Sequence, residues 1–455
     1  MIRIICPSNN IPERRYAIEV IFNDLLGCNL TADDIQFDAQ AVNYTIQVDG
    51  KEIVVEDHFF QQYPEPLSYL KAEHLPAELV YFHAMGKEIP IIYGVDRYEE
   101  TENRVTIGLD IFASTFFMLT RWEEVLLGRE EKGDCDETQL FTVKHDVYQR
   151  AIVHEYETLL RTLLNRMGFA TDVNRSYQLV VTHDVDGIIT PTWIDVAKTL
   201  YRQKVLGLPK KRRPADLTWR QQITYRKKYP TAFSQFQLYL DLCRKHQAQE
   251  WFYMKVCRMG EEECTYRDDD KRTKAVIRRI QALDYANVSL GFHPSQSTFC
   301  KQEQWNKEVE RLKQLIGELP IYGRNHHLLY NETTYRWWER LMCETKGRTG
   351  IVSNCVFHKR VGFRSGVAVP YTIFDLYERK PLQIKEVPCE IMDSAIRLHK
   401  YPSAEAAQSD IEKVIDEVRK YQGCLLLTWH IYIRSVETID YYYKWCQETM
   451  QYASK

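Results

Sequence analysis

Short apolar runs alternate with amphipathic stretches along the second half of the chain. Runs such as "YQLVV", "EWFYMKV", "GIVSNCV" and "CLLLTWH" have the length and composition of buried strands. Between them lie segments such as "KEVERLKQLIG" and "SDIEKVIDEVRKYQG", with apolar residues every three or four positions, which predicts helices. Strand and helix alternate about six or seven times after Tyr177, and this alternation is typical of a parallel sheet. We therefore expect an α/β fold over residues 173–455, an irregular (β/α) barrel of about seven strands.

The first part of the chain has a different pattern, which predicts an α+β domain over residues 1–172. "ERRYAIEVIFNDLLG" has helical periodicity, and "YTIQVDGKEIVV" contains two strand-like runs around Asp49-Gly50, a strong hairpin signal. A length of 455 residues exceeds what one hydrophobic core usually supports, which favours two domains. Because no cluster of histidines, paired carboxylates or glycines stands out here, we interpret this domain as a substrate-presenting or interaction unit.

Composition and charge narrow the choice of partners and of compartment. The chain has 60 basic and 63 acidic residues and a net charge of −3, so its overall charge predicts no nucleic-acid partner. We find no signal-peptide pattern and no apolar stretch of transmembrane length. The twelve cysteines are scattered and form no Cys-x-x-Cys pair, which indicates a reduced cytoplasmic protein. Nothing in the sequence indicates an oligomeric state.

A basic insertion over residues 198–230 departs from the strand and helix alternation. It is too long for a simple connection and carries Lys210, Lys211, Arg212 and Arg213, with Trp219 and Tyr225 nearby. One interpretation is a solvated surface, since runs of like charge usually face solvent. The other is a contact with an anionic glycan, a pyrophosphate-linked sugar or the cytoplasmic membrane surface.

Five of the predicted strands or loops end in polar residues that are suited to catalysis. They are "THDVD" at 182–186, "GFHPS" at 291–295, "GRNHH" at 323–327, "GFRSG" at 362–366 and "LTWH" at 427–430. Because the carboxyl ends of parallel strands face the ligand crevice, we expect these groups to converge.

The residue types at these ends point to a hydrolytic metal site. Aspartate and histidine ligands suit Zn²⁺, and also Co²⁺, Fe²⁺, Mn²⁺ or Ni²⁺, and three protein ligands leave one position open for water. Asp184 and Asp186 are two residues apart, so both can face the crevice, one binding the metal and the other accepting a proton from water. His430 is then available to protonate a leaving group.

From Tyr177 to Ser435 the chain resembles the polysaccharide deacetylases of the NodB-homology type. The resemblance rests on the five motifs above together with "VPYTIFDL" and "EVPCEIMD", in the branch with "THDVD" where better-known members have "TFDDG". The first part, with "DIFASTFFMLTRWEE", resembles the uncharacterised domain that precedes such deacetylases in Bacteroidetes-type proteins. Family members are partly irregular (β/α) barrels, usually with zinc, that remove an N- or O-linked acetyl group from a sugar.

The resemblance also implies roles for individual residues. Asp184 takes the place of the catalytic base, Arg364 of the arginine that orients it, and His430 of the general acid, while Asp393 is a candidate to orient a histidine. Asp186 and His293 take the places of metal ligands. The second histidine of the usual His-x-x-x-His spacing is missing, since position 297 is Ser, so we expect His326 to replace it, with His327 as the next choice. Ser295, His327 and Trp429 are the expected substrate contacts.

Two other functions remain open at this point. The lost His-x-x-x-His spacing also fits a catalytically inactive barrel that binds a glycan, and the same scaffold could hydrolyse a non-sugar amide. The expected partner is a carbohydrate, either lipid-linked or anionic, with a peripheral membrane contact as a further expectation.

Overall fold

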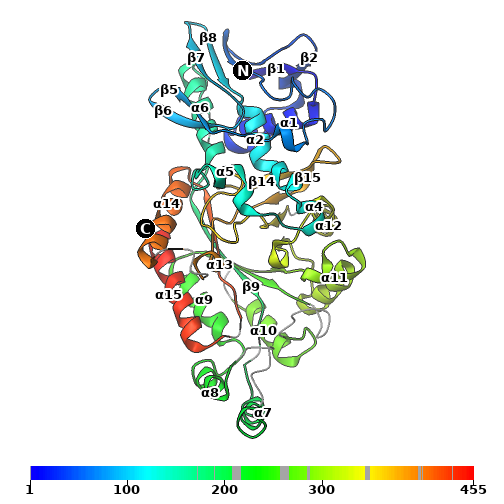
Figure 1. The fold of residues 1–455 in the computed structure, drawn as a ribbon, viewed down its shortest axis with the longest axis vertical. Helices are drawn as coiled ribbons and strands as arrows, with labels where there is room; N and C mark the ends of the chain where they lie inside the picture. The colour runs from blue at the N-terminus through cyan, green and yellow to red at the C-terminus, as the bar shows by residue number, and fades with distance from the viewer. Residues whose placement is uncertain are drawn as a thin grey trace.

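Two large sheets organise the chain, and Figure 1 shows the sheet of the first residues at one end of an elongated molecule. The computed structural model describes residues 2–171, 173–188, 190–207, 217–256, 266–283, 287–343, 349–397, 401, 403–432 and 434–455. The expected division into domains at residue 172 stays a prediction.

The first sheet has six strands in the order β2-β1-β3-β4-β8-β7, and β5 and β6 form a separate pair. The strands are β1 (Ile2–Pro7), β2 (Ile35–Asp38), β3 (Tyr44–Val48), β4 (Lys51–Val55), β5 (Val80–Ala84), β6 (Lys87–Ile91), β7 (Gly94–Glu100) and β8 (Arg104–Leu109). The expected hairpin is present as β3 and β4, with Asp49 and Gly50 both at positive φ, as a two-residue turn of matching twist requires.

Six helices accompany this sheet. They are α1 (Ile11–Glu19), α2 (Ile111–Thr120), α3 (Trp122–Leu126), α4 (Arg129–Lys132), α5 (Phe141–Lys144) and α6 (Ile152–Arg166). The helix predicted from "ERRYAIEVIFNDLLG" is α1, which continues as a π-helical segment at Val20–Leu25. Helices and a mixed sheet together give the α+β structure expected for this part.

The second sheet has nine strands in the order β14-β15-β13-β12-β11-β10-β9-β17-β16. The strands are β9 (Gln178–Val185), β10 (Gln249–Met254), β11 (Val288–Phe292), β12 (Tyr322–Gly323), β13 (Gly350–Val352), β14 (Tyr371–Asp375), β15 (Lys380–Glu386), β16 (Ile391–Met392) and β17 (Cys424–Thr428). All neighbours pair in parallel except β14 and β15. The sheet is curled into a half-barrel, so the α/β class is confirmed, while the barrel of about seven strands stays a prediction.

Among the described residues, nine helices accompany the second sheet. They are α7 (Trp193–Lys204), α8 (Trp219–Lys228), α9 (Ser234–Lys245), α10 (Lys271–Gln281), α11 (Gln302–Ile316), α12 (Glu332–Cys343), α13 (Asp393–Arg397), α14 (Ala404–Lys420) and α15 (Val436–Ala453). The expected basic insertion contains the end of α7 and all of α8. Its run from Lys210 to Arg213 lies outside the described residues.

The two parts of the chain share a hydrophobic core and a network of buried ion pairs. Tyr371, Phe374 and Leu376, from β14 and the residue after it, pack into the core of the first sheet. The Arg129 guanidinium lies 2.7 Å from a Glu332 oxygen, with both side chains buried. A buried charge that lost its partner would be costly, so this network favours one fixed arrangement of the two parts.

Candidate active site

Polar side chains from neighbouring parallel strands meet at the carboxyl edge of the second sheet. Asp184 is near the end of β9 and Asp186 follows it, while β10 and β17 on either side lead to Lys255 and His430. The strands farther out add Asp393 at the end of β16, His293 after β11, and Arg324 and His326 after β12. Ligands bind at this edge in open α/β sheets. Four of the five polar ends expected to converge meet here, and the fifth, which carries Arg364, does not.

Asp186, His293 and His326 form a group able to hold a metal ion. One ligand atom of each lies within 4.8 Å of the others. His293 is buried, His326 is nearly so, and the Asp186 side chain is 23% exposed. The three residues follow three different strands, so the sheet fixes their spacing, and the Asp186 side leaves an opening toward solvent. This is the trio expected from the sequence as metal ligands.

The hydrogen bonds of His293 prepare it to be a ligand. Its Nδ1 lies 2.7 Å from the Arg324 carbonyl oxygen, so Nδ1 carries the proton and donates it. Its Nε2 is buried without a hydrogen-bond partner, as is Oδ1 of Asp186. Burial lowers the pKa of His293 to about 4, which keeps the imidazole neutral at pH 7. A neutral imidazole with a fixed tautomer is the form that binds metals.

Lys255 is a site residue that the sequence reasoning missed. Its Nζ lies 3.1 Å from Nε2 of His326 and 3.6 Å from Oδ1 of Asp186, and the residue is 2% exposed. Its position in the sequence could have indicated this role, because Lys255 directly follows β10, as the other site residues follow their strands. The ammonium group places a positive charge beside two of the metal-ligand candidates, which disfavours a dication there.

Arg324 holds Asp184, in place of the Arg364 expected from the sequence. An Arg324 nitrogen lies 3.1 Å from the Asp184 carboxylate, and both side chains are buried. Burial raises the pKa of Asp184, but the charge of Arg324, together with His293 and His430, outweighs burial and holds that pKa well below its usual range. Arg364 instead donates to Glu124 of α3 at 2.7 Å and to the Val356 carbonyl, so its side chain is fully engaged away from the site.

His430 lies on the other side of Asp184 and is bound by Asp393. Its Nε2 is 3.7 Å from the Asp184 carboxylate, and its Nδ1 is 2.6 Å from Oδ1 of Asp393. Burial lowers the pKa of His430, but the Asp393 carboxylate, together with Asp184 and Asp186, more than offsets this and raises the pKa to about 9. A histidine that is protonated at neutral pH and held in one orientation has the properties of a general acid.

Among the described residues, one of the three expected substrate contacts, His327, lines a cavity. Ser295 is buried and donates to Glu308, and Trp429 is buried with its Nε1 donating to the Tyr442 carbonyl. Both side chains are therefore occupied in packing, and their role as substrate contacts stays a prediction. His327 is exposed and lines a cavity of about 360 Å³.

This cavity joins the two parts of the chain beside the site. Its lining residues are Asp134, Cys135, Asp136, Glu137, Gln296, His327, Leu329, His358, Lys359 and Ser394. His327 adjoins the metal-ligand candidate His326, and Ser394 adjoins Asp393. The first part of the chain, in which the sequence indicated no chemistry, thus supplies four wall residues.

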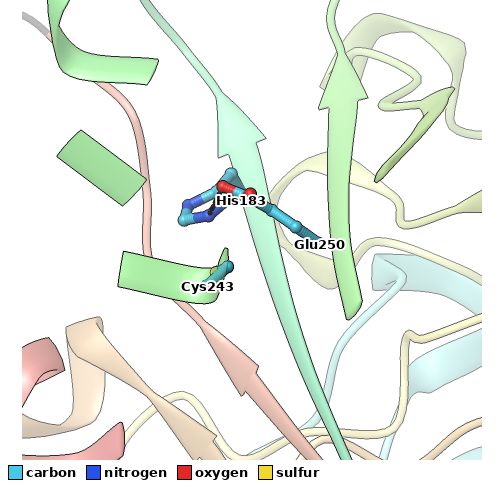
Figure 2. Close-up of side chains that lie close together, drawn as sticks. All are labelled: His183, Cys243 and Glu250. Carbon is cyan, nitrogen blue, oxygen red and sulfur yellow. Dashed lines mark ion pairs between the residues drawn. The ribbon is translucent and has the colours of Figure 1, made fainter. Parts of the chain in front are cut away.

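A second group with metal-binding side chains lies within the core, at His183, Cys243 and Glu250 (Figure 2). His183 Nε2 is 3.2 Å from a Glu250 oxygen, and its Nδ1 donates to the Trp429 carbonyl. All three side chains are fully buried, and burial raises the pKa of Glu250 and of the Cys243 thiol, which favours their neutral forms. The group is therefore enclosed in the core, away from solvent.

Comparisons with known proteins identify a family for the first part of the chain and a weak structural similarity to a solved structure. Residues 2–168 match the model of a family of unknown function (DUF7033). No curated protein matches the chain. Among solved structures, the chain is similar to a Bordetella bronchiseptica protein described as a candidate polysaccharide deacetylase involved in O-antigen biosynthesis, at 12% identity and a TM-score of 0.29. That similarity covers 56% of this chain and 72% of the other.

Proposed function

We propose that the protein is a metal-dependent hydrolase that removes an acetyl group, N- or O-linked, from a sugar. One observation carries the proposal: Asp186, His293 and His326 present ligand atoms within 4.8 Å of one another, beside a carboxylate and a histidine suited to proton transfer. The sugar part rests on the motif resemblance of the second half of the chain. The reduced cysteines, all ten free among the described residues, support a cytoplasmic location.

The donor set fits a divalent ion, and Zn²⁺ most closely. One carboxylate and two imidazoles are a common catalytic zinc set, and both the His293 Nε2 and the Asp186 Oδ1 lack hydrogen-bond partners. A divalent ion there supplies Lewis-acid chemistry, polarising a carbonyl oxygen and making water more acidic.

The chain's own residues supply the proton transfers. Asp184 is ionised because Arg324 lowers its pKa, so it can accept a proton from an attacking water. His430 is protonated and lies 3.7 Å from Asp184, so it can donate a proton to the departing amine or alkoxide. Asp393 keeps the ring oriented through Nδ1 and leaves Nε2 facing the site. Positioned proton transfer of this kind typically contributes about 10²–10⁴-fold.

The position of Lys255 supports a second candidate function, glycan binding by a catalytically inactive protein. Its ammonium group beside Asp186 and His326 can balance the Asp186 charge without a metal ion. The two functions differ in a simple measurement, since only the hydrolase releases acetate.

The test is acetate release from acetylated oligosaccharides by protein reconstituted with Zn²⁺. We expect release by the wild type, and a loss of about 10²–10⁴-fold in Asp184→Asn and in His430→Ala. An exposed substitution far from the site, Lys71→Gln, is the matched control. Acetate release that is equal in the wild type and in Asp184→Asn would contradict the proposal, and glycan binding without release would favour the second candidate.

A further inference from the structure

Helix α7 presents an apolar stripe to solvent. Trp193, Ile194 and Val205 are 58%, 65% and 66% exposed, and only Val196 of this helix is buried. In the same segment, Leu200, Tyr201 and Leu206 are exposed as well. Positions 193, 194, 200, 201 and 205 recur at helical spacing, so they share one face. A contiguous exposed apolar face on a soluble protein marks an interaction surface.

Helix α8 anchors this stripe to the rest of the molecule. Gln222 of α8 donates to the Thr199 hydroxyl of α7 at 3.0 Å, and the Arg226 guanidinium lies over the Trp193 ring. Tyr225, which the sequence suggested as a ligand contact, is instead buried in a small cluster with Val436 and Ile439 of α15. Figure 1 places α7 and α8 at the end of the molecule opposite the first sheet.

The surface around the stripe is strongly basic. Helices α7, α8 and α10 together carry twelve Lys and Arg residues and one acidic residue, Asp195. Asp195 is occupied in the capping box with Thr192 at the start of α7. This local charge contrasts with the net charge of −3 of the whole chain.

A cavity of about 360 Å³ adds to the same surface. Arg226, Arg272 and Arg279 line it, together with the hydroxyl-bearing residues Thr190, Thr192 and Thr231. Guanidinium and hydroxyl groups are the common partners of phosphate oxygens. The cavity lies next to the start of α7, so it is close to any surface that the stripe enters.

From these observations we propose that α7, α8 and α10 form a docking surface for a membrane rich in anionic phospholipid. The stripe enters the interface between headgroups and acyl chains, and the lysines and arginines contact headgroup phosphates. Trp193 and Tyr201 belong to the residue types that are enriched at this depth. No helix of the described residues is long and apolar enough to cross a membrane, so the contact is peripheral.

Charge decides between a membrane and the other occupants of such a surface. A second copy of the chain would bring two basic surfaces together, which is unfavourable. A nucleic acid would satisfy the charges but offers nothing to the apolar stripe. An anionic lipid surface matches both features. The inference does not depend on the proposed hydrolysis.

Co-sedimentation of the full-length protein with vesicles tests the inference. We expect binding to vesicles that contain phosphatidylglycerol, little binding to pure phosphatidylcholine, and weaker binding as salt increases. The triple variant Ile194→Ser/Tyr201→Ser/Val205→Ser and the triple variant Lys198→Gln/Arg202→Gln/Lys204→Gln should each bind at least tenfold more weakly. These side chains are largely solvent-accessible, so both variants should fold, which circular dichroism checks.

Matched controls separate the surface from general effects. Val42→Ser is an exposed apolar change and Lys71→Gln/Lys307→Gln/Lys380→Gln an exposed charge change, all away from α7, and both should bind like the wild type. Wild-type protein that does not bind anionic vesicles at low salt would overturn the inference. So would an apolar triple variant that binds like the wild type, or self-association of the wild type that this variant abolishes.

Discussion

His430 receives two contacts from one carboxylate: its Nδ1 lies 2.6 Å from Oδ1 of Asp393, and its backbone N–H donates to Oδ2 at 3.1 Å. The second contact ties the loop after β17 to the start of α13, so the ring has a fixed position before any substrate binds. This pairing was expected from the sequence, where Asp393 was the candidate to orient a histidine.

Asp393→Asn should move the alkaline limb of the pH profile to lower pH. The Asp393 charge raises the pKa of His430 to about 9, so its loss lowers that pKa. A general acid works only when protonated, so activity falls as pH rises through its pKa, and the fall then begins earlier. The measurement is kcat/KM against pH, with Asp410→Asn, on the partly exposed face of α14, as the control. An unmoved alkaline limb would show that His430 is not the acid.

Arg324 and Arg364 should respond differently to removal of their charge. Arg324→Met removes the cation that lowers the pKa of Asp184, so that pKa rises and the acidic limb moves to higher pH. Arg364→Met leaves Glu124 buried without its nearest cation, which should lower the free energy of unfolding by about 3–5 kcal/mol. Its acidic limb should stay in place. A shift of that limb in the Arg364 variant, with none in the Arg324 variant, would restore the assignment made from sequence.

Lys255→Met should tighten metal binding. The lysine ammonium stands 3.6 Å from the Asp186 carboxylate, where it repels a dication and competes for the same oxygen. We expect the dissociation constant for Zn²⁺, measured by competition with a chelator, to fall roughly tenfold or more. Lys271→Met, at the start of α10, is the control. Weaker metal binding in the Lys255 variant would mean that the lysine supports the ligands.

Trp429 and His327 offer a contrast between packing and substrate contact. Trp429→Phe removes the hydrogen bond from Nε1 to the Tyr442 carbonyl and leaves a gap in the core, so the free energy of unfolding should fall by about 1–3 kcal/mol with KM unchanged. His327→Asn should raise KM with little change in stability, because His327 lines the cavity and its backbone, at φ 55°, is one that Asn tolerates. Denaturant unfolding and steady-state kinetics test both. A raised KM in the Trp429 variant alone would return it to the substrate contacts.

Most of the site could be predicted from residues that follow the predicted strands. Asp186, His293 and His326 were expected to meet because each follows a strand of one parallel sheet, and the sheet order brings them together. The alternation of strand and helix patterns also predicted the α/β class. Closure of the barrel is harder to predict, because the pairing of edge strands depends on tertiary packing rather than on local pattern.

The choice between two arginines could not be made from sequence. Both Arg324 and Arg364 stand in motifs near strand ends, and only the partner of each distinguishes them. The partner of Arg364 is Glu124, 240 residues away in the chain, and no local pattern indicates that contact. The cavity walls at residues 134–137 were missed for the same reason, since their role comes from contact with the second sheet.

Metal content of three purified proteins tests the central claim most directly. After reconstitution with Zn²⁺ and removal of excess, elemental analysis should find stoichiometric metal in the wild type and in Cys243→Ala, since the buried group at His183, Cys243 and Glu250 is not the catalytic site. His293→Ala should lose both the metal and acetate release. Metal retained in His293→Ala but lost in Cys243→Ala, or a wild type that releases acetate without metal, would contradict the account.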